Sequence, residues 1–298
     1  MNARIVAAYA VMCAIWGTTW LAIKVALTGF PPLGGAGVRF IIAGAFLYAV
    51  GAIVRPNGAK PPLKLVLVLA ATFFGANYAL TYYAETHLAS GLVAVLFGTI
   101  PFFVFGLGAL MLRDAITLQT IAGAVLALGG VATISLTGEG GELIYVLAAL
   151  LAAALSAFGL VYLKRYAHSD SFRTLPPAML IAGISMTVSG ALVTPIDLHR
   201  ALTFPPILAT LYLAIFGSGV AFYLNHWLLQ RLPAWIVGLD ALVIPVVAVL
   251  IGTFVAHEAF GIRELIGAAL VIAGVWIALA GPITKQPANR RHGRPIET

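Results

Sequence analysis

Aromatic and polar side chains that could line a binding site lie along one hydrophobic stretch of the chain. Tyr78, Tyr82 and Glu85 lie three to four residues apart, so in a helix they share one face. The two phenol groups could stack on the ring of an aromatic ligand and attract an ammonium group. Because Tyr82 and Tyr83 approach the end of the stretch, an interfacial aromatic belt is the alternative. We favour a binding cavity for Tyr78 and Tyr82, and a belt for Tyr83.

The same kind of face returns later in the chain. Phe222 and His226 follow Tyr78 and Tyr82 by 144 residues, and Asn225 stands beside His226. A second polar and aromatic face is therefore expected opposite the first. The amide, imidazole and hydroxyl groups of the two faces could bind the amine and carboxylate of a zwitterion that carries a ring. We expect Tyr78, Tyr82, Asn225 and His226 to line one cavity.

Ionisable residues inside hydrophobic stretches are further candidates, because a charge placed there is costly and suggests a function. Asp240 could bind a substrate ammonium group or carry a proton, or it could cap a helix or form a salt bridge. Lys24 and Arg39 could bind a substrate carboxylate, and Arg39 could instead pair with an acid such as Glu85. Trp16 lies in the middle of its stretch, where it could line the cavity or pack beside a glycine. We count Trp16, Lys24, Arg39 and Asp240 as candidate substrate-binding residues.

Two prolines share the same spacing. Pro101 returns as Pro245, just as Gly75 returns as Gly219. Each proline stands near the middle of a hydrophobic stretch, where it removes a backbone donor and kinks a helix. Two symmetry-related kinks would suit hinges that open a site to one side of a membrane and then to the other. Static kinks that shape the cavity are the alternative, and we favour hinges.

Ten hydrophobic stretches must position these residues. A membrane-spanning helix needs about 20 apolar residues. The chain is 61% hydrophobic and 9% charged, whereas a soluble domain carries about 25% charged residues. The stretches are continuously apolar, which favours helices over a membrane barrel. They cover residues 5–27, 34–54, 63–84, 90–112, 116–136, 143–163, 174–194, 206–229, 233–256 and 262–281.

The 144-residue spacing runs through both halves of the chain. Gly123 and Gly130 return as Gly267 and Gly274, in pairs that allow close helix packing. Five predicted helices separate each residue from its counterpart. Because five is odd, the two halves must point in opposite directions, as in secondary transporters. We expect one half at residues 1–138 and the other at 139–284.

The basic residues predict the orientation. If the N-terminus is cytoplasmic, 13 of the 17 Lys and Arg residues fall on the cytoplasmic side. The positive-inside rule then places both termini in the cytoplasm. The basic tail at 285–298 is expected to be disordered and cytoplasmic, either touching anionic lipid or simply solvated. The net charge of +7 therefore concerns orientation and does not indicate nucleic-acid binding.

Other functional classes lack the residues that they need. A single cysteine, Cys13, excludes an intramolecular disulfide framework and a Cys-rich metal site. His87, His168, His199 and His257 are scattered over several predicted loops without ligand spacing. We therefore expect no enzyme, no metal and no cofactor. No phosphate-binding Gly-x-x-x-x-Gly-Lys-Ser/Thr motif occurs, so the energy source is the proton gradient or the substrate's own gradient.

Short motifs follow one another in a fixed order. They are Trp16-Gly17-Thr18-Thr19-Trp20, Lys24, Pro31-Pro32 and Arg39-Phe40, and in each half a proline, an acid and a Gly…Gly-Val. In this arrangement the sequence resembles the EamA-type members of the drug/metabolite transporter superfamily, from about residue 5 to 281. It departs from them at Asp114, where the family has Glu, while Glu258 is kept in the second half. The resemblance implies a ten-helix inner-membrane exporter with a central cavity between two inverted five-helix halves.

We therefore expect an all-α integral membrane protein that exports small amphipathic metabolites from the bacterial cytoplasm by alternating access. Aromatic and other neutral amino acids are the expected substrates, since the resemblance extends to aromatic amino acid exporters. The alternatives are a carrier of drugs or other metabolites from the same superfamily, and a membrane channel, which would conduct without saturation or counterflow. The expected partners are the small-molecule substrate and the lipid bilayer, and the expected state is a monomer.

Overall fold

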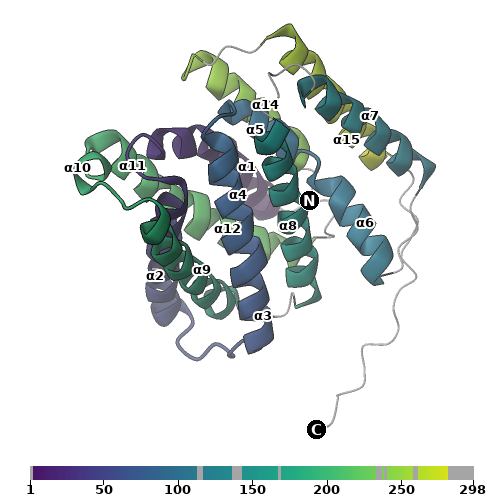
Figure 1. Ribbon diagram of the computed structural model, residues 1–298. Helices are drawn as coiled ribbons and strands as arrows, with labels where there is room; N and C mark the ends of the chain where they lie inside the picture. Colours follow the sequence, from purple (N-terminus) through teal and green to yellow (C-terminus); the bar gives the residue numbers. More distant parts are fainter. Residues whose placement is uncertain are drawn as a thin grey trace, which may run out of the picture.

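The computed structural model describes residues 3–112, 117–135, 143–166, 169–232, 237, 240–257 and 261–280. The regular elements among these residues are all helices, as the apolar stretches predict (Figure 1). The first half contains α1 (Ala3–Ala26), α2 (Pro32–Val54), α3 (Leu63–Val68), η1 (Leu69–Ala76), α4 (Asn77–Glu85), α5 (Ser90–Phe97), α6 (Ile100–Leu112) and α7 (Leu118–Ser135). The second half contains α8 (Leu143–Arg165), α9 (Ser171–Val193), α10 (Leu198–Ala201), α11 (Phe204–Tyr212), η2 (Leu213–Val220), α12 (Ala221–Leu229), α14 (Asp240–Phe254) and α15 (Ile262–Ala280). The predicted tail at 285–298, Asp114 and Glu258 lie outside the described residues.

Within the described part of the chain, seven helices are long and apolar enough to cross a membrane. They lie in the first four predicted stretches and in the sixth, seventh and eighth. Three shorter apolar helices, at Ile121–Thr133, Val243–Phe254 and Leu265–Ile277, lie in the fifth, ninth and tenth. Many large apolar side chains on these helices are exposed, among them Leu110 and Leu192. Apolar surface of this extent suits contact with lipid.

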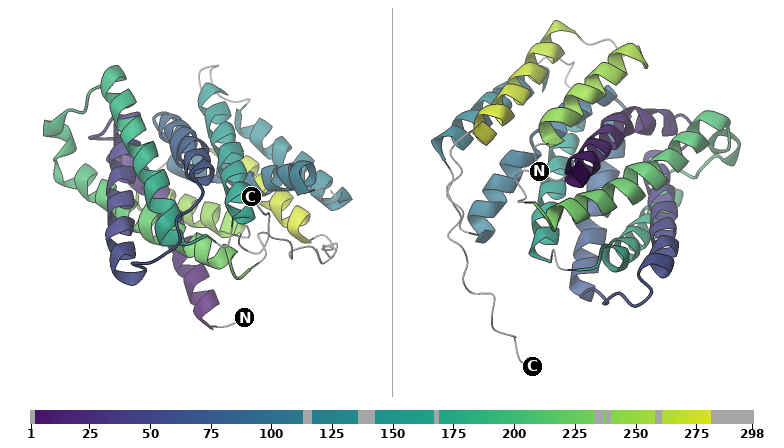
Figure 2. Two further views of the ribbon diagram at one scale, coloured as in Figure 1. Left: turned by 90° about the horizontal axis from the view of Figure 1, so that it is seen from below. Right: turned by 180° about the vertical axis from the view of Figure 1, so that it is seen from behind.

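Equivalent helices of the two halves pack against each other in antiparallel pairs. α2 and α9 are each 23 residues long, and they lie side by side (Figure 2). The backbone at Gly34 approaches Gly190, and that at Gly37 approaches Gly183. Residue numbers therefore rise along one helix as they fall along the other. Glycine at these points lets the two backbones come close.

α7 and α15 form a second pair of this kind. A β-carbon on Gly130 would lie 2.5 Å from the carbonyl oxygen of Gly267, and one on Gly274 would clash with the carbonyl oxygen of Gly123. The predicted role of these glycines in close helix packing is confirmed. Because two pairs of equivalent helices are antiparallel, the halves have the relative arrangement that an inverted repeat requires.

A π-helical segment interrupts the same place in each half. η2 begins and ends 144 residues after η1. A β-carbon on Gly75 would lie 2.6 Å from the carbonyl oxygen of Ala70, and one on Gly219 would lie 3.4 Å from that of Ala214. The wide turn thus leaves no room for a side chain at Gly75, whereas at Gly219 the nearest atom is a ring carbon of Phe46, 2.8 Å from such a β-carbon. Such π-helical turns are frequent at functional sites.

The fourth predicted stretch is interrupted. A turn at Gly98 and Thr99 separates α5 from α6. Pro101 therefore lies in the first turn of α6, where a helix needs no backbone donor. The expected kink in mid-helix at Pro101 is wrong, and the change of direction comes from the break before it. Pro245, in contrast, lies inside α14 as predicted.

α1 occupies a position between the two halves. It contacts α4 and α5 of the first half and η2, α11, α12 and α14 of the second. In Figure 2 helices of both halves lie beside it. Side chains of α1 that point inward therefore meet residues from both halves.

Candidate substrate site

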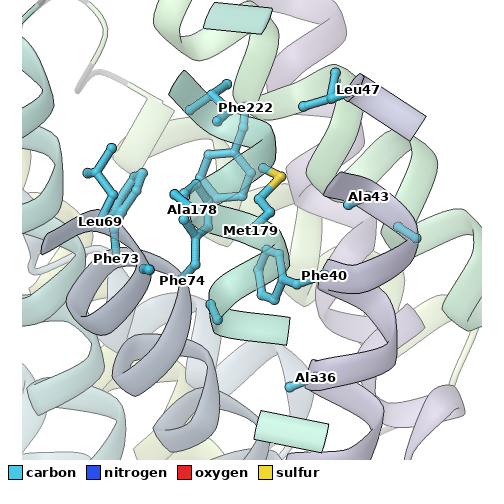
Figure 3. Close-up of a cluster of buried hydrophobic side chains, with 14 of the residues drawn as sticks. Ala36, Phe40, Ala43, Leu47, Leu69, Phe73, Phe74, Ala178, Met179 and Phe222 are labelled. Carbon is cyan, nitrogen blue, oxygen red and sulfur yellow. The ribbon is translucent and has the colours of Figure 1, made fainter. Parts of the chain in front are cut away.

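Six aromatic side chains from both halves converge between the helices and form the central aromatic cluster. Its members are Trp16 of α1, Phe40 of α2, Phe73 and Phe74 of η1, Tyr78 of α4 and Phe222 of α12. The ring centre of Phe222 lies 5.5 Å from Trp16, 5.4 Å from Phe73, 5.1 Å from Phe74 and 6.2 Å from Tyr78. These contacts are edge-to-face, which aromatic rings prefer. Phe40, Phe73, Phe74 and Phe222 point toward the same space in Figure 3.

Two predicted site residues, Trp16 and Tyr78, belong to this cluster. Tyr78 meets Phe222, its counterpart in the second half, as the 144-residue spacing predicts. Trp16 is half-buried, and its indole nitrogen donates a hydrogen bond of 3.3 Å to the carbonyl oxygen of Gly217 in η2. The cluster therefore joins α1 to a π-helical segment as well as joining the two halves.

Arg39 lies beside the cluster and is only 1% exposed. Its Nε donates a hydrogen bond of 2.8 Å to Ser218 Oγ, and its Nη2 donates one of 3.4 Å to the carbonyl oxygen of Gly217. The guanidinium carbon lies 4.7 Å from the centre of the Tyr78 ring and 5.4 Å from that of Phe40, within the range of a cation–π contact. The protein thus holds a full positive charge between α2, α4 and η2.

Tyr82 and Glu85 continue the face of α4 that begins at Tyr78. Tyr82 is 1% exposed and Glu85 is fully buried. The charges of Arg39 and Glu85 both act on the Tyr82 hydroxyl, so the three side chains belong to one neighbourhood. The predicted shared face of Tyr78, Tyr82 and Glu85 therefore exists, and Arg39 lies against it.

Asn225 and His226 are buried in a different place. The Nδ1 atom of His226 lies 2.8 Å from Ser171 Oγ, at hydrogen-bond distance, and Ser171 begins α9. Tyr82 instead lies beside Arg39. The structure therefore brings Phe222 and Tyr78 together but gives His226 and Tyr82 separate surroundings.

Lys24 has an equivalent in the second half that the sequence analysis missed. Each of two ammonium groups donates to two backbone carbonyls at the end of a helix. The bonds run from Lys24 to Glu85 at 2.9 Å and Leu88 at 2.7 Å, and from Lys164 to Leu229 at 2.6 Å and Leu232 at 3.3 Å. The second pair of acceptors follows the first by 144 residues. Cations at helix C-termini satisfy carbonyls that lack partners and favour the helix dipole. Lys24 therefore caps α4, and Lys164 caps α12.

An open pocket of about 460 Å³ lies where α4 ends. Its lining includes Lys24, Phe30, Glu85, Asp197 and Arg200. Lys24 therefore borders this pocket in addition to capping α4. Asp240, at the start of α14, lies elsewhere: its charge acts on the Tyr9 hydroxyl and the Cys13 thiol of α1.

The EamA-like transporter family model matches residues 4–136 and again residues 143–280. The chain belongs to the EamA-like transporter family. This EamA-like transporter is 26% identical to Protein PagO of Salmonella typhimurium over 91% of this chain and 92% of PagO. It is 29% identical to the uncharacterized inner membrane transporter YedA of Escherichia coli, over 90% and 88% of the two chains.

A third relative is the "Probable amino-acid metabolite efflux pump" of Escherichia coli, with 28% identity over 90% of this EamA-like transporter and 92% of the pump. One crystal structure matches with a TM-score of 0.68 at 18% identity, covering 93% of this chain and 98% of the other. At that identity the likeness concerns the fold alone. The family membership and the apolar helices together identify a membrane transporter.

Sequence reasoning on this EamA-like transporter missed Ser218 and Gly217, which hold Arg39. One signal was available: Ser218 stands 144 residues after Phe74, so the two halves differ in polarity at this position. Arg39 has no polar counterpart either: matching the starts of α2 and α9 pairs it with Ala178, and the residue 144 positions later is Gly183. A search for polar residues present in only one half would have paired Arg39 with Ser218.

Proposed function

We propose that this EamA-like transporter exports small amphipathic metabolites, above all aromatic and other neutral amino acids, by alternating access. The observation that carries the proposal is the central aromatic cluster with the buried charge of Arg39 beside it. Aromatic faces suit a substrate ring, and a guanidinium group suits a carboxylate. The Escherichia coli relative named for amino-acid metabolite efflux supports this substrate class, as does the sequence resemblance to aromatic amino acid exporters.

The proposed site consists of Trp16, Arg39, Tyr78 and Tyr82. Lys24 borders the pocket at one end of this site. In this proposal Asn225 and His226 line the route toward the cytoplasm, because they lie farther along α12 than Phe222. Asp240 is the proposed proton carrier if transport is coupled to protons.

The proposed membrane arrangement has ten spans in two halves, residues 1–138 and 139–284, with both termini and the tail at 285–298 in the cytoplasm. The distribution of basic residues and the antiparallel helix pairs support it. A monomer in the inner membrane is proposed, and the name of the relative YedA supports that location. The break before Pro101 and the helix interior at Pro245 are the proposed hinges for alternating access.

The test is uptake of labelled phenylalanine into proteoliposomes that contain the purified protein, with protein-free liposomes as the control. We expect saturable uptake, inhibition by other neutral amino acids, and faster uptake when the vesicles are preloaded with unlabelled phenylalanine. Counterflow of this kind separates a carrier from a channel. If no amino acid is transported or competes, the proposed substrate class is wrong. An imposed pH gradient that leaves uptake unchanged would remove Asp240 as a proton carrier.

A further inference from the structure

One guanidinium nitrogen of Arg39 differs from the other two in its hydrogen bonding. Nε and Nη2 are bonded to Ser218 and Gly217. The third nitrogen, Nη1, is buried and has no hydrogen-bond partner among the described residues. A buried charge is costly unless it is paired, and a buried donor without an acceptor carries a further cost. An acceptor that comes within hydrogen-bond distance of Nη1 would therefore remove this cost.

A second donor lies in the same neighbourhood. The Tyr82 hydroxyl is buried, and the charge and the side-chain hydrogen bonding of Arg39 both act on it. No hydrogen bond of normal geometry joins this hydroxyl to the described part of the chain. Guanidinium N–H and phenol O–H groups both donate to carboxylate oxygens. Two donors next to one positive charge suit the binding of an anion.

The open pocket comes close to one of these donors. Phe30 lines the pocket, and a β-carbon placed on Gly35 would lie 2.9 Å from the Phe30 β-carbon and 3.5 Å from the Tyr82 ring. Glu85 also lines the pocket and lies three residues after Tyr82 in α4. The Tyr82 ring therefore lies near the wall of the pocket.

The symmetry-related positions are apolar. Phe74 precedes Ser218 by 144 residues, and Ala178 has the place of Arg39 when the starts of α2 and α9 are matched. Both lie in the buried hydrophobic cluster that Figure 3 shows. The repeat therefore makes one set of positions charged and polar and the equivalent set apolar, and a molecule that joins a carboxylate to a ring or an alkyl group matches both sets.

We propose that Arg39 Nη1, together with the Tyr82 hydroxyl, binds the carboxylate of the transported amino acid, and that Ser218 is a positioning residue that aims the guanidinium. The inference rests on the proposed export of amino acids, and it assigns the substrate carboxylate to Arg39 and Tyr82. Arg39 contacts the substrate, whereas Ser218 acts through Arg39. The substrate ring lies against the central aromatic cluster.

The experiment measures uptake of labelled phenylalanine with three competitors: phenylalanine, 3-phenylpropionate, which lacks the amine, and phenethylamine, which lacks the carboxylate. In the unmodified protein we expect phenylpropionate to compete better than phenethylamine. Ser218→Ala should raise KM for phenylalanine about threefold to tenfold, the effect of one lost hydrogen bond. Arg39→Met should raise KM about 10- to 100-fold and should remove the preference for competitors with a carboxylate. Arg39→Lys should restore part of that preference.

The matched control for Ser218→Ala is Ser189→Ala, because Ser189 is exposed on α9 and its hydroxyl donates to the carbonyl oxygen of Ser185 in the same helix. Its KM should stay unchanged. Phenethylamine competing as well as phenylalanine, or a properly inserted Ser218→Ala protein with an unchanged KM, would overturn the carboxylate subsite while leaving amino acid export intact. These two readings hold even if Arg39→Met fails to fold. Absence of any uptake by the unmodified protein would instead overturn the proposed function and this inference with it.

Discussion

Among single residues, Phe222 has the widest set of contacts in the central aromatic cluster. Its ring touches one aromatic residue of α1, two of η1 and one of α4, and it is 4% exposed. A residue that joins the two halves through four rings at once supports both the packing of the helices and the apolar side of the proposed site.

Phe222→Ala is therefore expected to lower both stability and transport. Truncating a buried phenylalanine costs about 3 to 5 kcal/mol because it leaves a cavity. The thermal unfolding midpoint in detergent should fall, and KM for phenylalanine should rise. Phe254→Ala is the control, since that ring is 73% exposed on α14. Equal unfolding midpoints for the two variants would show that the cluster does not hold the halves together.

At the scale of helices and their segments, η1 and η2 depend on glycine. Gly75→Ala places a methyl group against the Ala70 carbonyl, so the π-helical turn must change. We expect lower thermal stability and reduced uptake. Gly129→Ala is the matched control, because nothing lies within 4 Å of a β-carbon there, and alanine is the better helix former by about 1 kcal/mol. The prediction fails if Gly75→Ala is as stable as Gly129→Ala.

The lysine caps on α4 and α12 give a second prediction at this scale. Lys24→Met and Lys164→Met each remove a cation from a helix C-terminus, which should cost about 1 kcal/mol. Because the acceptors are equivalent in the two halves, the two losses should be similar. Thermal unfolding of both variants, with the exposed Lys60→Met as the control, measures them. A Lys164→Met protein as stable as Lys60→Met would contradict the cap.

For the whole molecule, the proposed topology places the 55–62 loop in the cytoplasm and the α10 region outside. Asn57 and His199 are exposed in these two places, and Cys13 is the single cysteine. In a Cys13→Ala background, Asn57→Cys should react with a membrane-impermeant maleimide only after the cells are opened. His199→Cys should react in intact spheroplasts. The opposite pattern would reverse the proposed orientation.

Much of this organisation was predictable, because apolar length and the 144-residue spacing are properties of the chain itself. The glycine pairs of α7 and α15 and the meeting of Tyr78 with Phe222 followed from that spacing. Tyr82 and His226 lie apart for a geometric reason. Tyr78 and Phe222 meet because they lie close to the axis that relates the two halves. Tyr82 and His226 each lie one helical turn, about 5.4 Å, farther along helices that run in opposite directions, so they lie on opposite sides of that axis.

Other features of the structure could not be predicted from the types of residues in the sequence. The acceptors of Lys24 and Lys164 are backbone carbonyls, which every residue has. The π-helical turns differ from the α-helix in which backbone groups bond to each other, and the residues that form them are as apolar as those of the adjoining helices. The break at Gly98 and Thr99 lies inside a continuously apolar stretch, which predicts one unbroken helix. Within that stretch Pro101 is the residue that a sequence reader expects to disturb the helix. Prediction from the sequence was wrong for the helix at Pro101, and it did not include the lysine caps or the π-helical turns.

The Gly217 carbonyl in η2 has a consequence for genetics. It accepts hydrogen bonds from Trp16 and Arg39, yet no codon change can delete a backbone oxygen. Replacing Gly217 by a larger residue would place a side chain against Thr19. The measured effect would then come from this steric clash and not from the loss of an acceptor. A mutational scan will therefore detect the loss of these hydrogen bonds only at Trp16 and Arg39, which donate them. It will not identify the Gly217 carbonyl as the acceptor. Only an ester substituted for the peptide bond after Gly217, which weakens that acceptor, would reveal its share.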